Sequence, residues 1–200
     1  ANSSKTTEDD QRELRPAKSY EVIQTESALN RWCKDISKKK FFAIDTETTS
    51  LDTLTAEIVG ISMCVDLGKA CYIPISHKTD QLEYKDIEEK QLDRDIVLKK
   101  LRPLLADESI LKIGHNIKYD IKVLDNYKCQ VNSFDDTMLM SHCINGGQQR
   151  HSLDSVAKYL LNFETIKLRD LIGSGKKELN FMNVPISLAA DYAAEDADVT

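Results

Sequence analysis

The chain has 200 residues, of which 41% are hydrophobic and 30% charged, and its formal net charge is −6. This length suits one globular domain with a substantial apolar core. The negative charge argues against a protein that holds duplex nucleic acid by bulk electrostatic attraction. No apolar run reaches the length of a transmembrane segment and no signal peptide is recognisable, so no membrane partner is expected.

Five cysteines lie at scattered positions (33, 64, 71, 129 and 143) and form no CxxC pair. An odd number of such thiols is typical of reduced cysteines, which predicts a cytoplasmic protein.

The two ends of the sequence predict a piece of a longer polypeptide. The chain begins with Ala1, and residues 1–17 are polar and charged without periodicity, which indicates a linker or a disordered lead-in. The predicted domain occupies residues 18–200. It stops at Thr200 inside a helical pattern without a glycine or proline stop signal, so we expect a truncation near a C-terminal helix.

Most predicted strands lie in the first half of the chain. We expect strands at 20–24, 41–44, 57–65 and 70–75, a helix at 27–36, and a hairpin turn at 66–69. The run 41–44 is apolar on both faces, as a central strand covered on both sides should be.

The second half is predominantly helical. Helices are predicted at 95–105, 117–127, 134–143, 153–161 and from Ile186 to the end, with a short strand at 110–113 and a turn at Gly146 and Gly147. These elements predict an α/β fold in which a mixed sheet has helices on both faces.

Two carboxylates follow the central strand. The side chains of a strand alternate between its faces, so Asp45 and Glu47 point to the same side. The carboxyl end of a buried strand is a common place for ligand sites in α/β proteins. Taken alone, this pair is more simply explained as a solvated strand end or a turn.

A third carboxylate, Asp120, lies three residues after Ile117 and four before Leu124, on the apolar stripe of its predicted helix. The helix dipole also favours an acid there, and Asn116 falls where an N-cap residue is expected. A structural and a functional interpretation of Asp120 are therefore both open.

The last predicted helix carries the fourth carboxylate, Asp196, one turn after Tyr192. Both lie on a stripe with Leu188 and Val199, whereas the other acids of this helix face elsewhere (Asp191, Glu195 and Asp198). An acid on an apolar surface needs a counter-charge. Four such acids on three elements therefore suggest a shared cation.

Other patterns are weaker. Residues 173–177 lack the spacing of a phosphate-binding loop, and the histidines at 77, 115, 142 and 151 form no zinc pair. Asp135 and Asp136 are interpreted as helix-start carboxylates, with the metal site as the alternative.

Three stretches resemble the exonuclease motifs of bacterial DNA polymerase I (family A): residues 45–51, 115–120 and 192–198. Residues 134–139 and 173–181 are similar to that family as well, and the resemblance extends from about residue 20 to the end. It implies a ribonuclease H-like fold. Tyr192 implies the tyrosine-bearing subclass of the four-carboxylate exonucleases, because the other subclass has a histidine at that position.

The resemblance implies a site for two divalent metal ions, Mg²⁺ or Mn²⁺. Asp45, Glu47 and Asp196 would hold the first ion, Asp45 would bridge to the second, and Asp120 would contact the second ion through water. Oxygen ligands suit such hard cations. Two ions about 4 Å apart can activate the nucleophile and neutralise the leaving oxygen of an in-line displacement. Tyr192 would orient the attacking water.

Other residues would contact the substrate. Glu47 would touch the terminal 3′-hydroxyl, Leu51 would wedge between the last two bases, and Asn116 would position the strand end. Leu168 stands where the family can carry an aromatic residue that packs on the substrate's end. Because stacking contributes about 1–3 kcal/mol per base, we expect weaker strand-end affinity, with Phe163 or Phe181 as possible substitutes.

The sequence thus predicts a proofreading 3′→5′ exodeoxyribonuclease, part of a DNA-directed DNA polymerase, which releases nucleoside monophosphates from single-stranded or frayed DNA 3′ ends. A polymerase domain in the same parent chain would be its partner. The alternatives are a ribonuclease D-like RNA-trimming exonuclease and a catalytically silent structural module of a polymerase. The runs 48–52 and 195–198 favour the polymerase I type.

Overall fold

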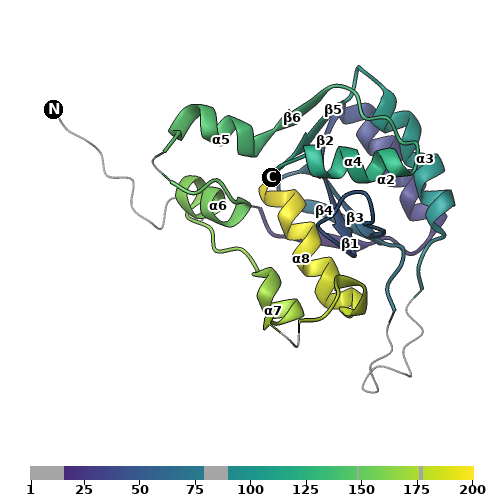
Figure 1. Ribbon diagram of the computed structural model, residues 1–200. Helices are drawn as coiled ribbons and strands as arrows, with labels where there is room; N and C mark the ends of the chain where they lie inside the picture. Colours follow the sequence, from purple (N-terminus) through teal and green to yellow (C-terminus); the bar gives the residue numbers. More distant parts are fainter. Residues whose placement is uncertain (1–15, 79–89, 148, 176–177) are drawn as a thin grey trace.

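The computed structural model describes residues 16–78, 90–147, 149–175 and 178–200 (Figure 1). The lead-in predicted at 1–17 lies outside these ranges except for Pro16 and Ala17. Within them, no helix is both long enough and apolar enough to cross a membrane.

The described residues form one six-stranded sheet with the order β1-β4-β3-β2-β5-β6. Strand β3 pairs antiparallel with both β2 and β4, whereas β1 pairs with β4, β5 with β2, and β6 with β5 in parallel. The mixed sheet predicted from the sequence is confirmed. Its strands are Ser19–Val22 (β1), Phe41–Thr48 (β2), Ile58–Asp66 (β3), Lys69–Pro74 (β4), Leu111–Gly114 (β5) and Phe134–Asp136 (β6).

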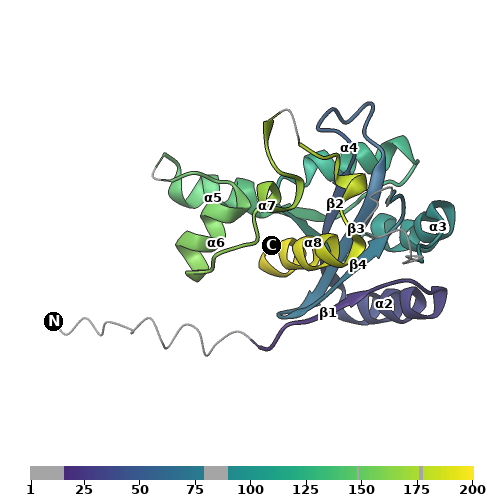
Figure 2. The same cartoon turned by 90° about the horizontal axis from the view of Figure 1, so that it is seen from below.

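Helices cover both faces of the sheet, as predicted (Figures 1 and 2). Helices α2 (Glu26–Lys39), α3 (Arg94–Ala106) and α4 (Lys118–Asn126) contribute to the larger core on one face. Helix α8 (Ile186–Val199) packs across the other face. The connection from β6 to α8 contains α5 (Thr137–Asn145), α6 (Leu153–Leu161), α7 (Leu168–Ile172) and the 3-10 turn η3 (Phe181–Asn183).

Strand β2 separates the two cores. Phe42 and Ile44 belong to the larger core beside α2 and α3, whereas Ala43 belongs to the small core beneath α8. The same alternation directs Asp45 and Glu47 to the α8 side. The prediction that these two acids share a face is therefore confirmed.

Two predicted boundaries are wrong. Strand β2 does not end near Ile44 but continues to Thr48, because β3 pairs with it that far. The helix predicted at 134–143 begins only at Thr137, because the three preceding residues pair in parallel with β5. A strand of three residues leaves no periodic signal, so only the neighbouring strand determines it.

Helix α8 faces the sheet with alanines. Ala189, Ala190, Ala193, Ala194 and Ala197 are all buried against the strands. The distance between packed elements depends on the size of the side chains at the contact, so these short side chains allow a close approach. Residues at the edge of this alanine surface can therefore reach β2.

Candidate active site

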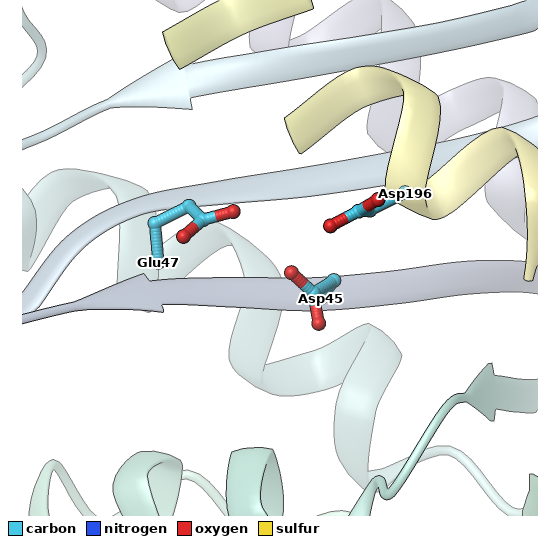
Figure 3. Close-up of side chains that lie close together, drawn as sticks. All are labelled: Asp45, Glu47 and Asp196. Carbon is cyan, nitrogen blue, oxygen red and sulfur yellow. The ribbon is translucent and has the colours of Figure 1, made fainter. Parts of the chain in front are cut away.

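Three carboxylates converge beside the end of β2 (Figure 3). Asp45 and Glu47 extend from β2, and Asp196 extends toward them from α8. One oxygen atom from each side chain lies within 4.8 Å of the other two. Within the described part of the chain, no lysine, arginine or histidine forms an ion pair with any of the three.

Burial and mutual repulsion raise the pKa values of these acids. Removal from water raises the pKa of Asp45 to about 6, although a hydrogen bond from the Thr46 backbone N–H opposes the rise. Burial, followed by the charges of Asp45 and Asp196, raises the pKa of Glu47 well above its usual range. Burial and Asp45 raise the pKa of Asp196 in the same way. A bound cation would relieve this repulsion and favour the ionised forms.

Asp120 lies beside this group, on α4. It is only 2% exposed, which confirms its predicted place on the apolar stripe. Its Oδ1 accepts a hydrogen bond from the Thr46 backbone N–H at 2.9 Å and another from Thr46 Oγ1 at 2.6 Å. Burial and the charge of Asp45 raise the pKa of Asp120 well above its usual range, and the Thr46 bonds oppose this rise.

Tyr192 is half-buried at the edge of α8 and shares a hydrogen bond with the carboxylate of Asp196. This contact confirms that the two residues are neighbours one turn apart. Burial, followed by the charges of Asp196 and Glu47, raises the pKa of the Tyr192 phenol. The phenol therefore stays protonated at neutral pH and donates its proton to the Asp196 carboxylate.

All eight site residues named from the sequence line one open cleft of about 710 Å³. The four carboxylates and Tyr192 are joined there by Leu51, Asn116 and Leu168, which come from a loop after β2, the turn before α4, and α7. Ile172 and Leu179 add apolar surface. The cleft thus has acids in one part and apolar side chains around them.

Only one of the two aromatic residues considered as substitutes at position 168 lies in this cleft. Phe181 lines it, with its ring centroid 6.1 Å from that of Tyr192. Phe163 is not among the lining residues and lies instead beneath the Lys18 ammonium, 5.2 Å from its ring centroid. The lining of the cleft therefore favours Phe181 over Phe163 as the substitute.

Asn116 is not the N-cap of α4, contrary to the prediction. The capping position is Ile117, which has no side-chain cap, and Asn116 takes a left-handed conformation with φ of 66°. Its backbone N–H donates to the Asp136 carboxylate at 3.0 Å. Its side-chain Oδ1 is buried and has no hydrogen-bond partner among the described residues. An unpaired polar atom beside a cleft is available to a ligand.

Asp136 is the N-cap of α5, since its carboxylate accepts hydrogen bonds from the backbone N–H groups of Met138 and Leu139 at 2.9 and 3.3 Å. This confirms the helix-start interpretation for Asp136, which does not belong to the described carboxylate cluster.

Glu195 and Asp198, two acids placed away from the apolar stripe of α8, are nevertheless buried, at 2% and 7% exposure. The stripe predicted through Leu188, Tyr192, Asp196 and Val199 is therefore not the buried face of α8: Leu188 is 50% exposed, the other three are half-buried, and the alanines pack on the sheet instead. Helical periodicity describes one face of a helix and cannot reveal a segment that packs against the opposite face.

Two hydroxyl side chains near the site were missed in the sequence analysis. Thr46 bonds to Asp120, as described above. Tyr119 donates to the backbone carbonyl of Ser50 at 2.5 Å and also contacts the hydroxyl of Thr48, so it anchors the segment that leads to Leu51. Neither residue interrupts an apolar pattern with a charge, which is the signal that revealed the acids.

The mixed sheet and its carboxylate cluster agree with the ribonuclease H-like exonuclease predicted from the sequence. Residues 20–200 match a family model described as 3′-5′ exonuclease, so this chain belongs to the 3′-5′ exonuclease family. The chain is 41% identical to DNA polymerase I of Pseudomonas aeruginosa and 38% identical to DNA polymerase I of Rhizobium leguminosarum. Each match covers 90% of this chain but only 20% and 19% of those proteins. The chain thus spans about a fifth of the length of these relatives.

Solved structures share the fold. RNase D of Trypanosoma brucei in complex with RNA U12 has a TM-score of 0.69 at 16% identity, over 96% of this chain and 62% of that one. RNase D of Escherichia coli has a TM-score of 0.65 at 18% identity, over 90% and 42%. Brucella melitensis NrnC with bound Mg²⁺ has a TM-score of 0.62 at 21% identity, over 92% and 76%. At these identities the likeness concerns the fold alone, and it confirms the predicted ribonuclease H-like fold.

Proposed function

We propose that the cleft removes nucleotides one at a time from single-stranded or frayed DNA 3′ ends and releases nucleoside monophosphates. The observation that carries this proposal is the convergence of Asp45, Glu47 and Asp196 in an open cleft. Among the described residues, no basic side chain forms an ion pair with these three acids. Membership of the 3′-5′ exonuclease family and the similarity to two DNA polymerases I support it.

The donor set fits hard divalent cations. Every ligand atom of the cluster is a carboxylate oxygen, which suits Mg²⁺ or Mn²⁺ and not a metal that prefers thiolates. Asp45, Glu47 and Asp196 would hold one ion, and Asp45 with Asp120 would serve a second. When bound, such ions polarise the attacking water and neutralise charge on the leaving oxygen of the phosphodiester.

The neighbouring side chains would orient the reacting groups. The phenol of Tyr192 lies next to Asp196; with that carboxylate engaged by a metal ion, its single proton would turn to the attacking water and hold it in line with the phosphorus atom. Glu47 stands on the same face as Asp45 and would also accept a hydrogen bond from the terminal 3′-hydroxyl.

The rim of the cleft suits an unpaired strand end. Leu51 is 92% exposed at the cleft and can insert between the last two bases, while Leu168 and Leu179 offer apolar surface to the terminal base. The unpaired Oδ1 of Asn116 can accept a hydrogen bond from the strand. A chain with a formal charge of −6 would thus hold DNA by its end, with metal ions offsetting the phosphate charge.

The comparison with the two DNA polymerases I suggests which domain accompanies the cleft in the parent protein. Because this chain corresponds to about a fifth of each DNA polymerase I that it matches, we propose that a polymerase domain accompanies it in the parent protein. The cleft would then act in proofreading, on 3′ ends that have left the polymerase site.

The proposal is tested by incubating the protein with 5′-labelled single-stranded DNA in Mg²⁺ or Mn²⁺ and resolving the products by length. We expect stepwise shortening from the 3′ end that EDTA and Asp45→Ala both abolish. Asp125→Ala is a matched control, because Asp125 is an exposed carboxylate of α4 outside the cleft. DNA that stays intact at saturating metal would overturn the proposal. Faster trimming of RNA than of DNA would favour the ribonuclease D-like alternative.

A further inference from the structure

Thr46 separates the two carboxylates of β2 and faces the opposite side of the sheet. It is 6% exposed, and its backbone N–H and its hydroxyl both donate to the same atom, Oδ1 of Asp120. The two distances, 2.9 and 2.6 Å, are those of well-formed hydrogen bonds to a carboxylate. Thr46 therefore restrains Asp120 at one oxygen from two directions.

The sheet leaves this part of β2 open to Asp120. Strand β5 pairs with β2 only at Phe41, Phe42 and Ala43, and the chain then turns away into α4. The turn is tight, because a Cβ atom on Gly114 would lie 2.7 Å from the side chain of Ile117. Helix α4 thus occupies the place where β5 would have continued. The Thr46 N–H, which would donate to a backbone carbonyl of a longer β5, donates to the Asp120 carboxylate instead.

We propose that Thr46 is a positioning residue of the exonuclease site: by holding Oδ1, it turns the second oxygen of Asp120 toward the metal site that Asp120 shares with Asp45. The inference rests on the proposed function of the cleft. Asp45 and Thr46 are consecutive residues of one strand, so the same short segment determines the position of both carboxylates. Hydrogen bonds to a charged acceptor are roughly twice as strong as neutral ones, which suits this task.

The test compares Thr46→Val, which loses the hydroxyl but keeps the branched shape, with Thr46→Ser, which keeps the hydroxyl. Calorimetric titration with Mn²⁺, with and without a deoxynucleoside monophosphate, measures metal binding independently of activity. We expect Thr46→Val to weaken the weaker Mn²⁺ site about tenfold, the effect of losing one hydrogen bond to a charged group. Thr46→Ser should stay within about twofold of wild type, since the same bond survives.

Kinetic measurements should show the same pattern. At subsaturating Mg²⁺, Thr46→Val should reduce kcat about tenfold while KM for DNA changes little, and added Mg²⁺ should restore part of the rate. Thermal unfolding without metal checks that the variants are folded. If Thr46→Val does not fold, Thr46→Ala removes the same hydroxyl without a steric demand.

A double-mutant cycle with Asp120→Asn tests whether the effect passes through Asp120. In the Asp120→Asn background, Thr46→Val should weaken Mn²⁺ binding no further. An equal loss in both backgrounds, or wild-type Mn²⁺ binding in Thr46→Val, would overturn the proposal. A protein that binds Mn²⁺ but leaves DNA intact would contradict the exonuclease function and not the role of Thr46. No Mn²⁺ binding by the wild type would contradict both.

Discussion

Helix α8 holds carboxylates in two contrasting environments. Glu195 accepts a hydrogen bond from the backbone N–H of Ile166 at 2.6 Å and forms an ion pair with Lys18. One residue further, Asp196 faces Asp45 and Glu47, which carry the same charge. Consecutive residues of a helix point about 100° apart, so neighbours in sequence can enter unrelated surroundings.

Asp198 resembles Glu195 in its surroundings. Its carboxylate accepts hydrogen bonds from the backbone N–H of Gly68 at 2.6 Å and from the Tyr20 hydroxyl at 2.9 Å. Both acids therefore bind α8 to other elements through donors that the protein itself supplies. Asp196 shares a hydrogen bond with the Tyr192 phenol but otherwise faces the carboxylates of Asp45 and Glu47. An acid among donors stabilises a fold, whereas an acid among acids is stabilised by a cation or by taking up a proton.

The largest expected effect follows from Asp196→Asn. This change removes a metal ligand, so we expect kcat on single-stranded DNA to fall about a thousandfold. It also removes one of several repelling charges, so the free energy of unfolding without metal should stay the same or increase. Quenched-flow or gel assays measure the first effect and urea unfolding in EDTA the second. A marked loss of metal-free stability would show that Asp196 is structural like its neighbours.

Metal binding should stabilise the folded protein. A ligand that binds only the folded state at 100 times its Kd adds about 2.7 kcal/mol to the free energy of unfolding. For a chain of this length the melting temperature should rise by about 5–10 °C when Mn²⁺ replaces EDTA. Asp45→Ala should abolish the rise, whereas Glu195→Gln should retain it. Equal shifts in all three proteins would indicate that the metal binds elsewhere.

The stability of the metal-free protein should depend on the charge of Asp45. Its pKa is about 6 in the folded protein, above the usual value of 3.8, so the folded state binds this proton more tightly than the unfolded state. The contribution of Asp45 is thus fully present below about pH 4 and is lost as the pH rises through 6.

This dependence can be isolated by comparison with Asp45→Asn. Between pH 4.5 and 7, the stability of Asp45→Asn relative to the wild type should rise by about 1–3 kcal/mol in EDTA, since one pKa unit corresponds to about 1.4 kcal/mol. Urea titrations at the two pH values measure the difference. Parallel pH profiles would contradict the raised pKa of Asp45.

The smallest effect is expected for Glu195→Gln, the counterpart of Asp196→Asn. The amide oxygen can still accept the Ile166 N–H bond, but the charge that faces Lys18 is lost. Because the Lys18 side chain is 47% exposed, water screens the pair, and the loss of stability should be about 1 kcal/mol. Equilibrium unfolding in urea measures it. Activity should stay within a few-fold of wild type. A loss of activity as large as that of Asp196→Asn would contradict the assignment of Glu195 to the fold and of Asp196 to the active site.

Much of the site could be predicted from short-range patterns. The strict alternation of a strand places Asp45 and Glu47 on one face, and the helical period brings Tyr192 next to Asp196. Asp120 could be identified as buried because its own helix is amphipathic. Each of these conclusions depends on the geometry of one element, which a few neighbouring residues determine.

Other features depend on partners that are remote in the sequence. Thr46 meets Asp120 across 74 residues, and Gly68 meets Asp198 across 130. The N-cap prediction for Asn116 is wrong because the tight turn after β5 imposes a left-handed residue before α4. No spacing rule covers such contacts, since they arise only when separate elements pack together.

By itself, the sequence determined that Asp45 and Glu47 share a face, that Asp120 is buried and that Tyr192 lies next to Asp196, because strands and helices have fixed periods. The tertiary structure decided what each buried acid meets. Glu195 and Asp198 find donors, while Asp45, Glu47 and Asp196 find one another, because hydrogen-bond partners are brought together by packing and not by position along the chain. Which acids bind α8 to other elements and which form the cluster in the cleft is therefore decided by the assembled molecule.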